Sequence, residues 1–294
     1  MAREGVATLV AAAAQLGVQL VAPAREAAKH DVLVPFAEEG DIGTIARSCD
    51  AAIVLAGDGT LLHLAAQLLD GPPLLGVNYG MVGYLSGAGR DRVTHAVERL
   101  VEGNFQTVEL GVLEARLGGG GKVIALNDIV ASGGVTGRVI QVSWRVLPAS
   151  GVPPIEMGTI PCDGMVVATP VGSTAYNLSN GGPVMAWGVE GHVVSFIAPH
   201  TLAARPLVVA PGDSIEITHM GRGAPLKLFA DGRKAGVLES NEHLTVGPGP
   251  GRARLVMLDD ITFYERYRDN FAATVLSSDA GPAGQRPPDR QVHS

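Results

Sequence analysis

The sequence predicts an α/β fold in two parts: a first part with a parallel sheet and helices on both of its faces, then a larger part rich in β-structure. Up to about residue 104, helical periods alternate with short apolar runs, the order that makes βαβ units. From about residue 105, long helical periods disappear and short alternating runs appear between glycine and proline turns. This change is typical of a transition to antiparallel β-structure.

The first part is expected to supply the elements of the parallel sheet in alternation. Residues 51–55 form a continuous apolar run, as expected of a parallel strand that is buried on both faces. Asp41 is suited to cap the helix that follows it. The pattern predicts helices over residues 6–16, 41–48, 61–69 and 91–102, and strands over residues 18–22, 51–55 and 74–77.

The second part is expected to be largely antiparallel, with the glycine run 118–121 at a hairpin tip. From Ser278 the chain has almost nothing to bury, so residues 278–294 are expected to be a disordered tail. Strands are expected over residues 108–117, 122–130, 138–147, 193–197, 206–210, 214–219 and 252–258.

The composition argues against several classes of protein. With 46% hydrophobic and 17% charged residues, the chain of 294 residues is too apolar to be disordered. Its 22 basic and 29 acidic residues give a net charge of −7, which argues against a nucleic-acid or anionic-membrane binder. Cys49 and Cys162 are its only cysteines and form no CxxC pair, so neither a disulfide scaffold nor a cysteine zinc site is expected.

The uncharged stretch of residues 5–24 has two interpretations, a signal peptide or a helix followed by a strand. Its alanine-rich composition and the glutamines Gln15 and Gln19 favour the helix, because alanine is too weakly apolar for a convincing membrane span. No other uncharged stretch approaches the ~20 residues that a span needs. The protein is therefore expected in the cytoplasm, with neither a membrane nor a nucleic acid as partner.

The common nucleotide-binding and hydrolase motifs are absent from the sequence, which has no GxxxxGK[ST], no GxSxG, no HExxH and no GxGxxG after a strand. A first candidate site is instead the turn Gly57-Asp58-Gly59-Thr60. It lies between the strand 51–55 and the next helix. At such a turn, free N–H groups and flanking glycines let a phosphate approach, while Asp58 could orient Mg²⁺ or accept a proton from a hydroxyl. A tight turn with an aspartate N-cap is an equal alternative.

A second cluster occupies residues 163–183, DGMVVATPVGSTAYNLSNGGP. It combines a Gly-Ser-Thr turn, the aromatic ring of Tyr176, and the polar side chains of Asn177, Ser179 and Asn180. Small polar groups beside one aromatic ring suit a nucleoside. The alternative, a glycine-rich Greek-key connection, explains fewer of these polar groups.

A third candidate is the pair Asn127-Asp128, which follows the apolar run 123–126. Asparagine donates and accepts hydrogen bonds while an aspartate carboxylate only accepts, a combination that suits the two hydroxyls of a ribose. A plain turn is the alternative. Arg138, further along, could meet a phosphate or lie solvated at the surface.

These clusters, in this order, resemble those of the NAD kinases, the ATP- or polyphosphate-dependent enzymes that make NADP. GDGT alone is weak because lipid and sugar kinases of the same superfamily share it, whereas the GSTAYNLS block with PHTL and RPLVV is specific. The resemblance covers roughly residues 50–235 and rests on AGDGTLL (56–62), LLGVNYGMVGYL (74–85), ALNDIV (125–130), the block 163–183, APHTLAARPLVV (198–209) and ADGR (230–233).

The resemblance implies a role for each matched residue. Asp58 would be the general base that takes the proton from the adenosine 2′-hydroxyl of NAD, within a phosphate loop of Gly57, Gly59 and Thr60. Asn127 and Asp128 would hold the ribose. Other contacts with NAD would come from Thr174, Ala175, Tyr176 (by stacking), Asn177, Leu178 and Ser179, and from Arg138, Asp163 and Arg233.

The resemblance also implies cofactor, partners and architecture. Mg²⁺ would bind through the phosphates, with Asp58 as the candidate protein contact, and the phosphoryl donor would be ATP or polyphosphate. The chain would assemble as a homodimer or homotetramer in which a neighbouring subunit completes the site. A Rossmann-like α/β domain over residues 1–104 would be completed by residues 252–277, and a β-sandwich-like NAD-binding domain would span residues 105–251.

Three features depart from the family pattern. Ala56 replaces the first glycine of GGDGT, and Gly111 stands where relatives usually carry an arginine. The family's first strand should precede the helix 6–16, whereas this sequence begins at the helix, so either translation starts upstream or the sheet has one strand fewer. Two alternative functions remain: a lipid or sugar kinase of the same superfamily, and a non-catalytic NAD(P)-binding sensor.

Overall fold

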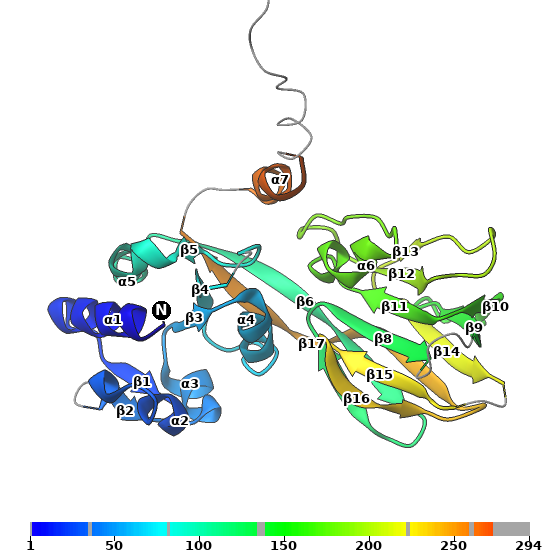
Figure 1. Ribbon diagram of the computed structural model, residues 1–294, viewed down its shortest axis with the longest axis horizontal. Helices are drawn as coiled ribbons and strands as arrows, with labels where there is room; N and C mark the ends of the chain where they lie inside the picture. The colour runs from blue at the N-terminus through cyan, green and yellow to red at the C-terminus, as the bar shows by residue number, and fades with distance from the viewer. Residues whose placement is uncertain are drawn as a thin grey trace, which may run out of the picture. The chain divides into compact units, whose positions relative to one another are not determined.

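The computed structural model describes residues 2–34, 37–80, 83–133, 139–221, 224–258 and 262–272 (Figure 1). They belong to two compact units, residues 1–260 and residues 261–294. The second unit contains α7 (Phe263–Tyr267) and a π-helical turn, η4 (Arg268–Ala272). The helices of the first unit are α1 (Ala2–Leu16), α2 (Ala24–Ala27), α3 (Ile42–Ser48), α4 (Asp58–Ala65), α5 (Val93–Val101) and α6 (Tyr176–Ser179), with the 3-10 turns η1 (Asp31–Leu33), η2 (Arg90–Arg92) and η3 (Gly172–Thr174).

The strands of the first unit form three sheets. A parallel pair joins β1 (Leu20–Ala22) to β2 (Ala37–Glu39). The nine-stranded sheet contains β3 (Ala52–Ala56), β4 (Leu74–Asn78), β5 (Ala88–Gly89), β6 (Gln106–Leu117), β7 (Lys122–Ala125), β9 (Ile140–Leu147), β10 (Ile155–Cys162), β14 (Ser214–Met220) and β17 (His243–Met257). The six-stranded sheet contains β8 (Asp128–Gly133), β11 (Gly164–Ala168), β12 (His192–Ile197), β13 (Leu207–Val209), β15 (Leu226–Ala230) and β16 (Arg233–Leu238).

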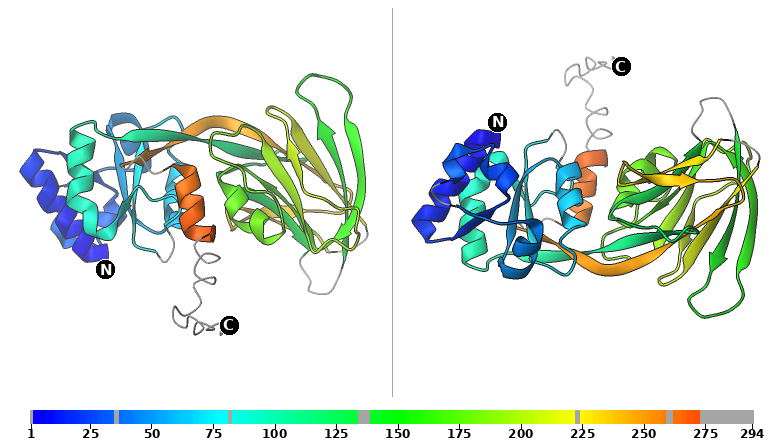
Figure 2. Two further views of the ribbon diagram at one scale, coloured as in Figure 1. Left: turned by 90° about the horizontal axis from the view of Figure 1, so that it is seen from above. Right: turned by 90° about the horizontal axis from the view of Figure 1, so that it is seen from below.

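Helices cover both faces of the parallel strands β3, β4 and β5, as the sequence predicts. Leu75 and Val77 of β4 pack in one cluster with apolar residues of α1 and α5. Gly76, between them, faces the other way, where an added Cβ would stand 2.6 Å from a methyl of Leu61 in α4. Figures 1 and 2 show the same arrangement, with α1 and α5 on one side of the strands and α4 on the other.

The two expected parts share one sheet. The long strands β6 and β17 pair antiparallel from Gln106↔Met257 to Leu117↔Leu244, and Leu255 of β17 pairs parallel with Leu74 of β4. The path β10-β9-β14-β17-β4-β3 therefore runs from the β-rich part into the parallel strands. The boundaries at residues 104 and 251 stay predictions.

The β-rich part is a sandwich of the nine-stranded and six-stranded sheets, which confirms the expected fold class. Its core combines residues of both, such as Trp144 and Ile217 from one sheet with Met165 and Leu228 from the other. The six-stranded sheet also buries its outer face, where Val130 of β8 packs with Met185 and its neighbours. That outer face holds the cavity described below.

Several elements differ from the expectation. α4 begins at Asp58, three residues before the predicted start at Leu61, because Gly57 takes the N-cap position. The expected strand 122–130 is divided into β7 and β8, since the N–H groups at the break bond to Asp231. Strands β2, β5, β10, β11, β15 and β16 were not predicted as elements.

Other expectations concern the strands near the N-terminus, the C-terminal tail and membrane spans. The strand predicted at 18–22 pairs with β2, and within the described ranges β3 has β4 as its only strand partner. Arg138 and the predicted tail 278–294 lie outside the described residues. Of the helices that the structure describes, none combines the length and apolarity needed to cross a membrane.

Candidate active site

The carboxylate of Asp58 connects the start of α4 to the loop after β4. Its Oδ2 accepts hydrogen bonds from the N–H groups of Tyr84 (2.7 Å) and Leu85 (3.3 Å), and its Oδ1 accepts one from the Ser86 hydroxyl (3.3 Å). These bonds fix the orientation of the carboxylate at the first turn of the helix. The segment LLGVNYGMVGYL thus contacts the GDGT turn directly.

The phosphate-loop candidates lie on an open side of that first turn. Gly59 and Thr60 are exposed, and a Cβ added to Gly59 would meet no atom within 4 Å. Helix N-termini carry free N–H groups that attract anions. Gly57 is closer to its surroundings, since its added Cβ would lie 3.5 Å from Gly80. A phosphate therefore has room beside Gly59.

A cavity of about 430 Å³ follows β8 on the outer face of the six-stranded sheet. Asp128, Val130 and Ser132 alternate along this strand, so their side chains share one face. Of the residues that the structure describes, those that line it are Asn127, Asp128, Val130, Ser132, Ala175, Tyr176, Phe229, Asp231 and Gly232. The structure thus brings Asn127, Asp128, Ala175 and Tyr176, four of the predicted dinucleotide contacts, into one cavity.

Asp128 is the buried charge of this cavity, with 5% of its surface exposed. Burial, reinforced by the nearby negative charge of Asp231, raises the pKa of the Asp128 carboxyl to about 7. Within the described part of the chain, the amide oxygen of Asn127 beside it is buried without a hydrogen-bond partner. Buried polar atoms of this kind suit a polar ligand.

The Gly-Ser-Thr turn crosses directly over the Asn127 loop. The Thr169 N–H donates to the Asn127 carbonyl (2.9 Å), and the Gly172 N–H donates to the Thr169 hydroxyl (3.0 Å). A Cβ on Gly172 would overlap the carbonyl of Asn127. Glycine is required here by close approach of two backbones, which places Ala175 and Tyr176 over the cavity.

The remaining residues of the GSTAYNLS block have different surroundings. Asn177 is fully buried and donates to the carbonyls of Ser173 and Pro183, both at 3.0 Å, so its amide nitrogen holds the turn together. The Thr174 hydroxyl donates to the Val171 carbonyl (3.0 Å). Leu178 is half-buried and Ser179 exposed. None of these side chains lines the cavity.

Arg233 and Asp163 lie outside the cavity lining but near its ends. Arg233 follows Gly232 in the β15–β16 turn and contacts His63 of α4. This contact joins the turn beside the cavity to the helix that starts at Asp58. His63 has a lowered pKa because of burial and the charges of Arg233 and Arg25. Asp163 is half-exposed and lies 3.7 Å from His200 of the PHTL segment.

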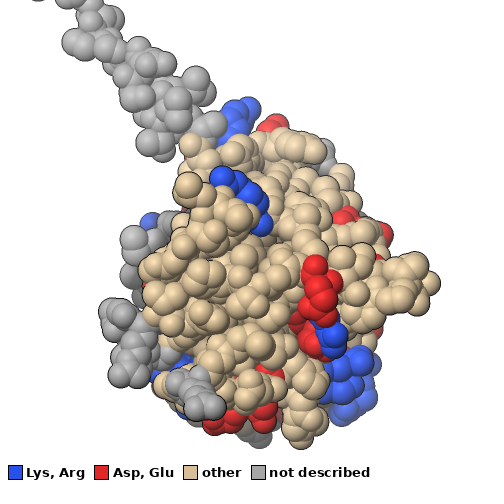
Figure 3. All heavy atoms as spheres, turned by 90° about the vertical axis from the view of Figure 1, so that its right-hand side faces the viewer, with Lys and Arg blue, Asp and Glu red and all other residues tan. Residues whose placement is uncertain are grey.

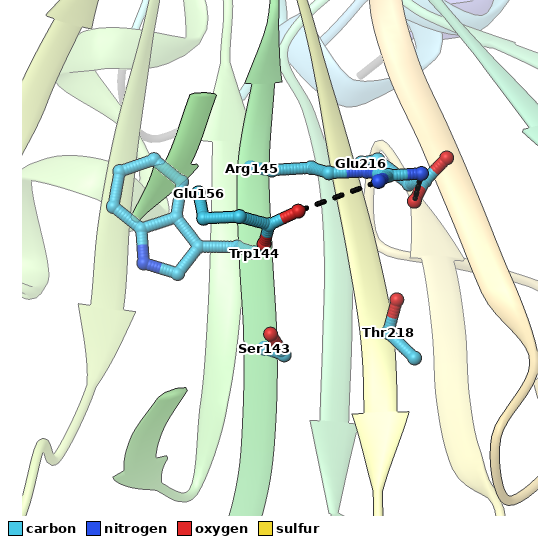
Figure 4. Close-up of a pocket in the computed structure, with 6 residues that line it drawn as sticks. All are labelled: Ser143, Trp144, Arg145, Glu156, Glu216 and Thr218. Carbon is cyan, nitrogen blue, oxygen red and sulfur yellow. Dashed lines mark hydrogen bonds and ion pairs between the residues drawn. The ribbon is translucent and has the colours of Figure 1, made fainter. Parts of the chain in front are cut away.

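A second, smaller cavity of about 190 Å³ lies on strands β9, β10 and β14 of the other sheet (Figure 4). Arg145 extends between Glu156 (3.4 Å) and Glu216 (2.7 Å), and Ser143 and Thr218 complete the polar surface. The guanidinium already pairs with both carboxylates. Among the described residues that line it, this cavity therefore offers no unpaired cation to an anionic ligand.

Neither cavity is a metal cage. Among the residues that the structure describes, no three His, Cys, Asp or Glu side chains gather closely enough to hold a metal ion. Mg²⁺ commonly binds through substrate phosphates with one or two carboxylates. The open space beside Gly59, next to the Asp58 carboxylate, fits a magnesium ion of that kind better than a protein-enclosed one.

Sequence reasoning missed several residues of the site. Asp231 and Gly232 belong to the ADGR segment and Val130 to the ALNDIV segment, but no role was expected of these three residues. Phe229 and Ser132 lie outside every segment quoted for the resemblance. The period of two along residues 128–132 was the available signal for β8. The contact of Asp58 with residues 84–86 required knowledge of how the loop folds.

Two family descriptions match the chain, "ATP-NAD kinase N-terminal domain" over residues 10–105 and "ATP-NAD kinase C-terminal domain" over residues 151–258. The NAD kinase of Gemmatimonas aurantiaca is 36% identical over 263 residues, which cover 86% of this chain and 88% of that protein. The chain belongs to the NAD kinase family. Another member, the NAD kinase of Leifsonia xyli subsp. xyli, is 37% identical over 243 residues, 80% of this chain and 77% of that protein.

Solved structures of NAD kinase family members have the same fold. The alignment with the crystal structure of yeast NADH kinase complexed with NADH covers 98% of this chain and 86% of the yeast chain. Its TM-score is 0.77 at 20% sequence identity. The alignment with the crystal structure of an NAD kinase from Archaeoglobus fulgidus in complex with ATP covers 78% of this chain and 83% of that chain. Its TM-score is 0.62 at 28% sequence identity. The resemblance and the fold class that the sequence predicts are thereby confirmed.

Proposed function

We propose that this protein is an NAD kinase, which transfers a phosphoryl group from ATP to the 2′-hydroxyl of the adenosine ribose of NAD and releases NADP. The observation that carries the proposal is the cavity along β8, where the buried Asp128 and Asn127 lie beneath Tyr176. Those groups suit a ribose and a base ring. The Arg233–His63 contact brings this cavity next to α4, the helix that begins at Asp58.

In this proposal Asp58 is the general base. A secondary alcohol is a poor nucleophile, so the site must hold it in line with the terminal phosphate and remove its proton. The bonds from Tyr84, Leu85 and Ser86 orient the carboxylate that would accept this proton. Gly59 and Thr60 would face the phosphates, with Gly57 allowing the tight turn before them.

The dinucleotide would occupy the cavity itself. Asn127 and Asp128 would bond the ribose hydroxyls, and Tyr176, with 41% of its surface exposed, would stack on the adenine. Ala175 lies against the same cavity. Further contacts are proposed for Thr174, Asn177, Leu178, Ser179, Asp163, Arg233 and Arg138.

Mg²⁺ is the proposed cofactor. Bound to the donor's phosphates, it would offset their negative charge as the phosphoryl group moves. Asp58 is the side chain proposed to contact it. ATP is the proposed donor, with polyphosphate as the alternative, because both present similar anions to the open side of α4. The cytoplasmic location stays a prediction from the sequence.

The chain is also proposed to assemble as a homodimer or homotetramer. β10 is an edge strand whose residues 155–159 are all exposed, including the apolar Ile155 and Met157. Uncovered edge strands favour pairing with another chain. Figure 3 looks onto this end of the β-rich part, where most of the visible atoms belong to uncharged residues. Light scattering of the purified protein would give the mass, and a monomer would contradict this assembly.

The proposed activity is tested by NADP formation from NAD, Mg²⁺ and either ATP or polyphosphate, detected with an NADP-specific dehydrogenase. Product that disappears with EDTA supports a metal-dependent kinase, and the comparison of donors identifies the phosphoryl source. Binding of NAD without any product would instead favour the non-catalytic sensor. Phosphorylation of a lipid or sugar in place of NAD would favour another kinase of the superfamily.

A further inference from the structure

The turn between β15 and β16 holds the Asn127–Asp128 loop through a single carboxylate. Asp231 Oδ2 accepts the Leu126 N–H (2.9 Å), and its Oδ1 accepts the N–H groups of Asn127 (2.6 Å) and Asp128 (3.2 Å). In return, the Asp231 N–H donates to the Asp128 carbonyl (3.0 Å). Four hydrogen bonds therefore join two turns that lie more than a hundred residues apart in the sequence.

These bonds replace sheet pairing at the break between β7 and β8. Three successive backbone N–H groups converge on one carboxylate, an arrangement by which peptide groups commonly bind anions. Asp231 adopts a φ of 48°, a left-handed conformation that aspartate tolerates better than most residues. The loop depends on this anion, since few other groups could satisfy three N–H groups at once.

We propose that Asp231 is a positioning residue, which holds Asn127 and Asp128 in the geometry that binds the ribose of the dinucleotide. This inference rests on the proposed function. Asp231 need not touch the substrate, because it acts through the backbone of the two residues that do.

The negative charge of Asp231 gives a readout that a purely structural bond would not move. Asp231 is the charged group that faces Asp128, and Asp231 in turn lies near His63 of α4 and precedes Arg233. Removing its charge lets the Asp128 carboxyl ionise at lower pH. If the ionised carboxylate binds the ribose, the pH midpoint of NAD affinity shifts downward.

The test compares Asp231→Asn with Asp213→Asn, a matched control. Asp213 also bonds a backbone N–H across two turns, that of Ala149 at 2.8 Å, but it does not line the cavity. We expect Asp231→Asn to raise the dissociation constant of NAD about tenfold by calorimetry, in line with the loss of charge-assisted bonds. Its pH midpoint should fall, and Asp213→Asn should change neither quantity.

Amide hydrogen exchange tests the holding role without any substrate. The peptide containing residues 126–128 should exchange faster in Asp231→Asn than in the wild type and in Asp213→Asn. Equal exchange in all three proteins would overturn the proposal, whether or not the protein makes NADP. Faster exchange with unchanged NAD affinity and pH midpoint would also overturn it, since Asp231 would then serve stability alone.

Discussion

At the scale of single residues, Tyr176 offers a direct test of the adenine site. Tyr176 is the first residue of α6, and its exposed ring lines the cavity. Tyr176→Ala should weaken NAD binding by about 1–3 kcal/mol through lost stacking, and Tyr176→Phe should retain most of the affinity. Calorimetry measures both. Tyr264→Ala, at an exposed tyrosine of the second unit, is the control, and unaltered affinity in Tyr176→Ala would disprove the stacking role.

Sequence reasoning identified residues whose partners are close in the chain better than those with distant partners. Asp41 was predicted to cap a helix, and its carboxylate indeed accepts the Thr44 N–H at 2.6 Å. Asp231 accepts hydrogen bonds from residues 126–128, and no pattern in the sequence around Asp231 predicts a partner so far away in the chain. The use of Asn177 within its own turn was also hidden, because an amide suits a ligand and a backbone equally well.

At the scale of elements, the crossing of η3 over the β7–β8 loop requires glycine at position 172. A methyl group there would overlap the Asn127 carbonyl, and neither backbone can move without breaking the Thr169 bonds. Gly172→Ala should therefore destabilise the protein by about 1–3 kcal/mol, the usual cost of overpacking. Urea unfolding measures this. Gly119→Ala, at an open hairpin tip, is the matched control, and an equal, small effect of the two would argue against the tight crossing.

The elements themselves were predictable to the extent that periodicity determines them. The continuous run 51–55 and the helix after Asp41 appear as β3 and α3. β10 escaped prediction because the alternation that begins at Ile155 and Met157 stops at Gly158 and Thr159, and residues 155–159 are all exposed. The departure at Gly111 also has a local explanation, since the guanidinium of Arg252 on β17 lies where a side chain at position 111 would stand.

At the scale of the whole molecule, two buried groups affect stability in opposite directions as the pH falls. Burial lowers the pKa of His192 to about 4, so below its ordinary 6.5 the unfolded chain binds the extra proton and stability is lost. The pKa of Asp128 is raised to about 7, so at acidic pH its carboxyl is protonated in the folded chain while the unfolded carboxyl stays ionised. Asp128 therefore contributes stability at acidic pH, and this contribution is lost as the pH rises through 7.

Variants should separate the two effects. Between pH 7.5 and pH 5, each group changes the free energy of unfolding by about 2 kcal/mol, at about 1.4 kcal/mol per pKa unit. Relative to the wild type, His192→Gln should therefore gain stability on acidification and Asp128→Asn should lose it. Urea unfolding at the two pH values measures both, and parallel pH profiles for all three proteins would contradict this account.

The central claim, phosphoryl transfer with Asp58 as the base, is tested most directly by measuring turnover and NAD binding on the same preparations. Asp58→Asn is compared with the wild type and with Asp50→Asn, which removes an exposed carboxylate just before β3. We predict that Asp58→Asn loses NADP formation by about 10²–10⁴-fold, the range of a general base, while NAD affinity stays close to that of the wild type. Undiminished NADP formation in Asp58→Asn would contradict the account.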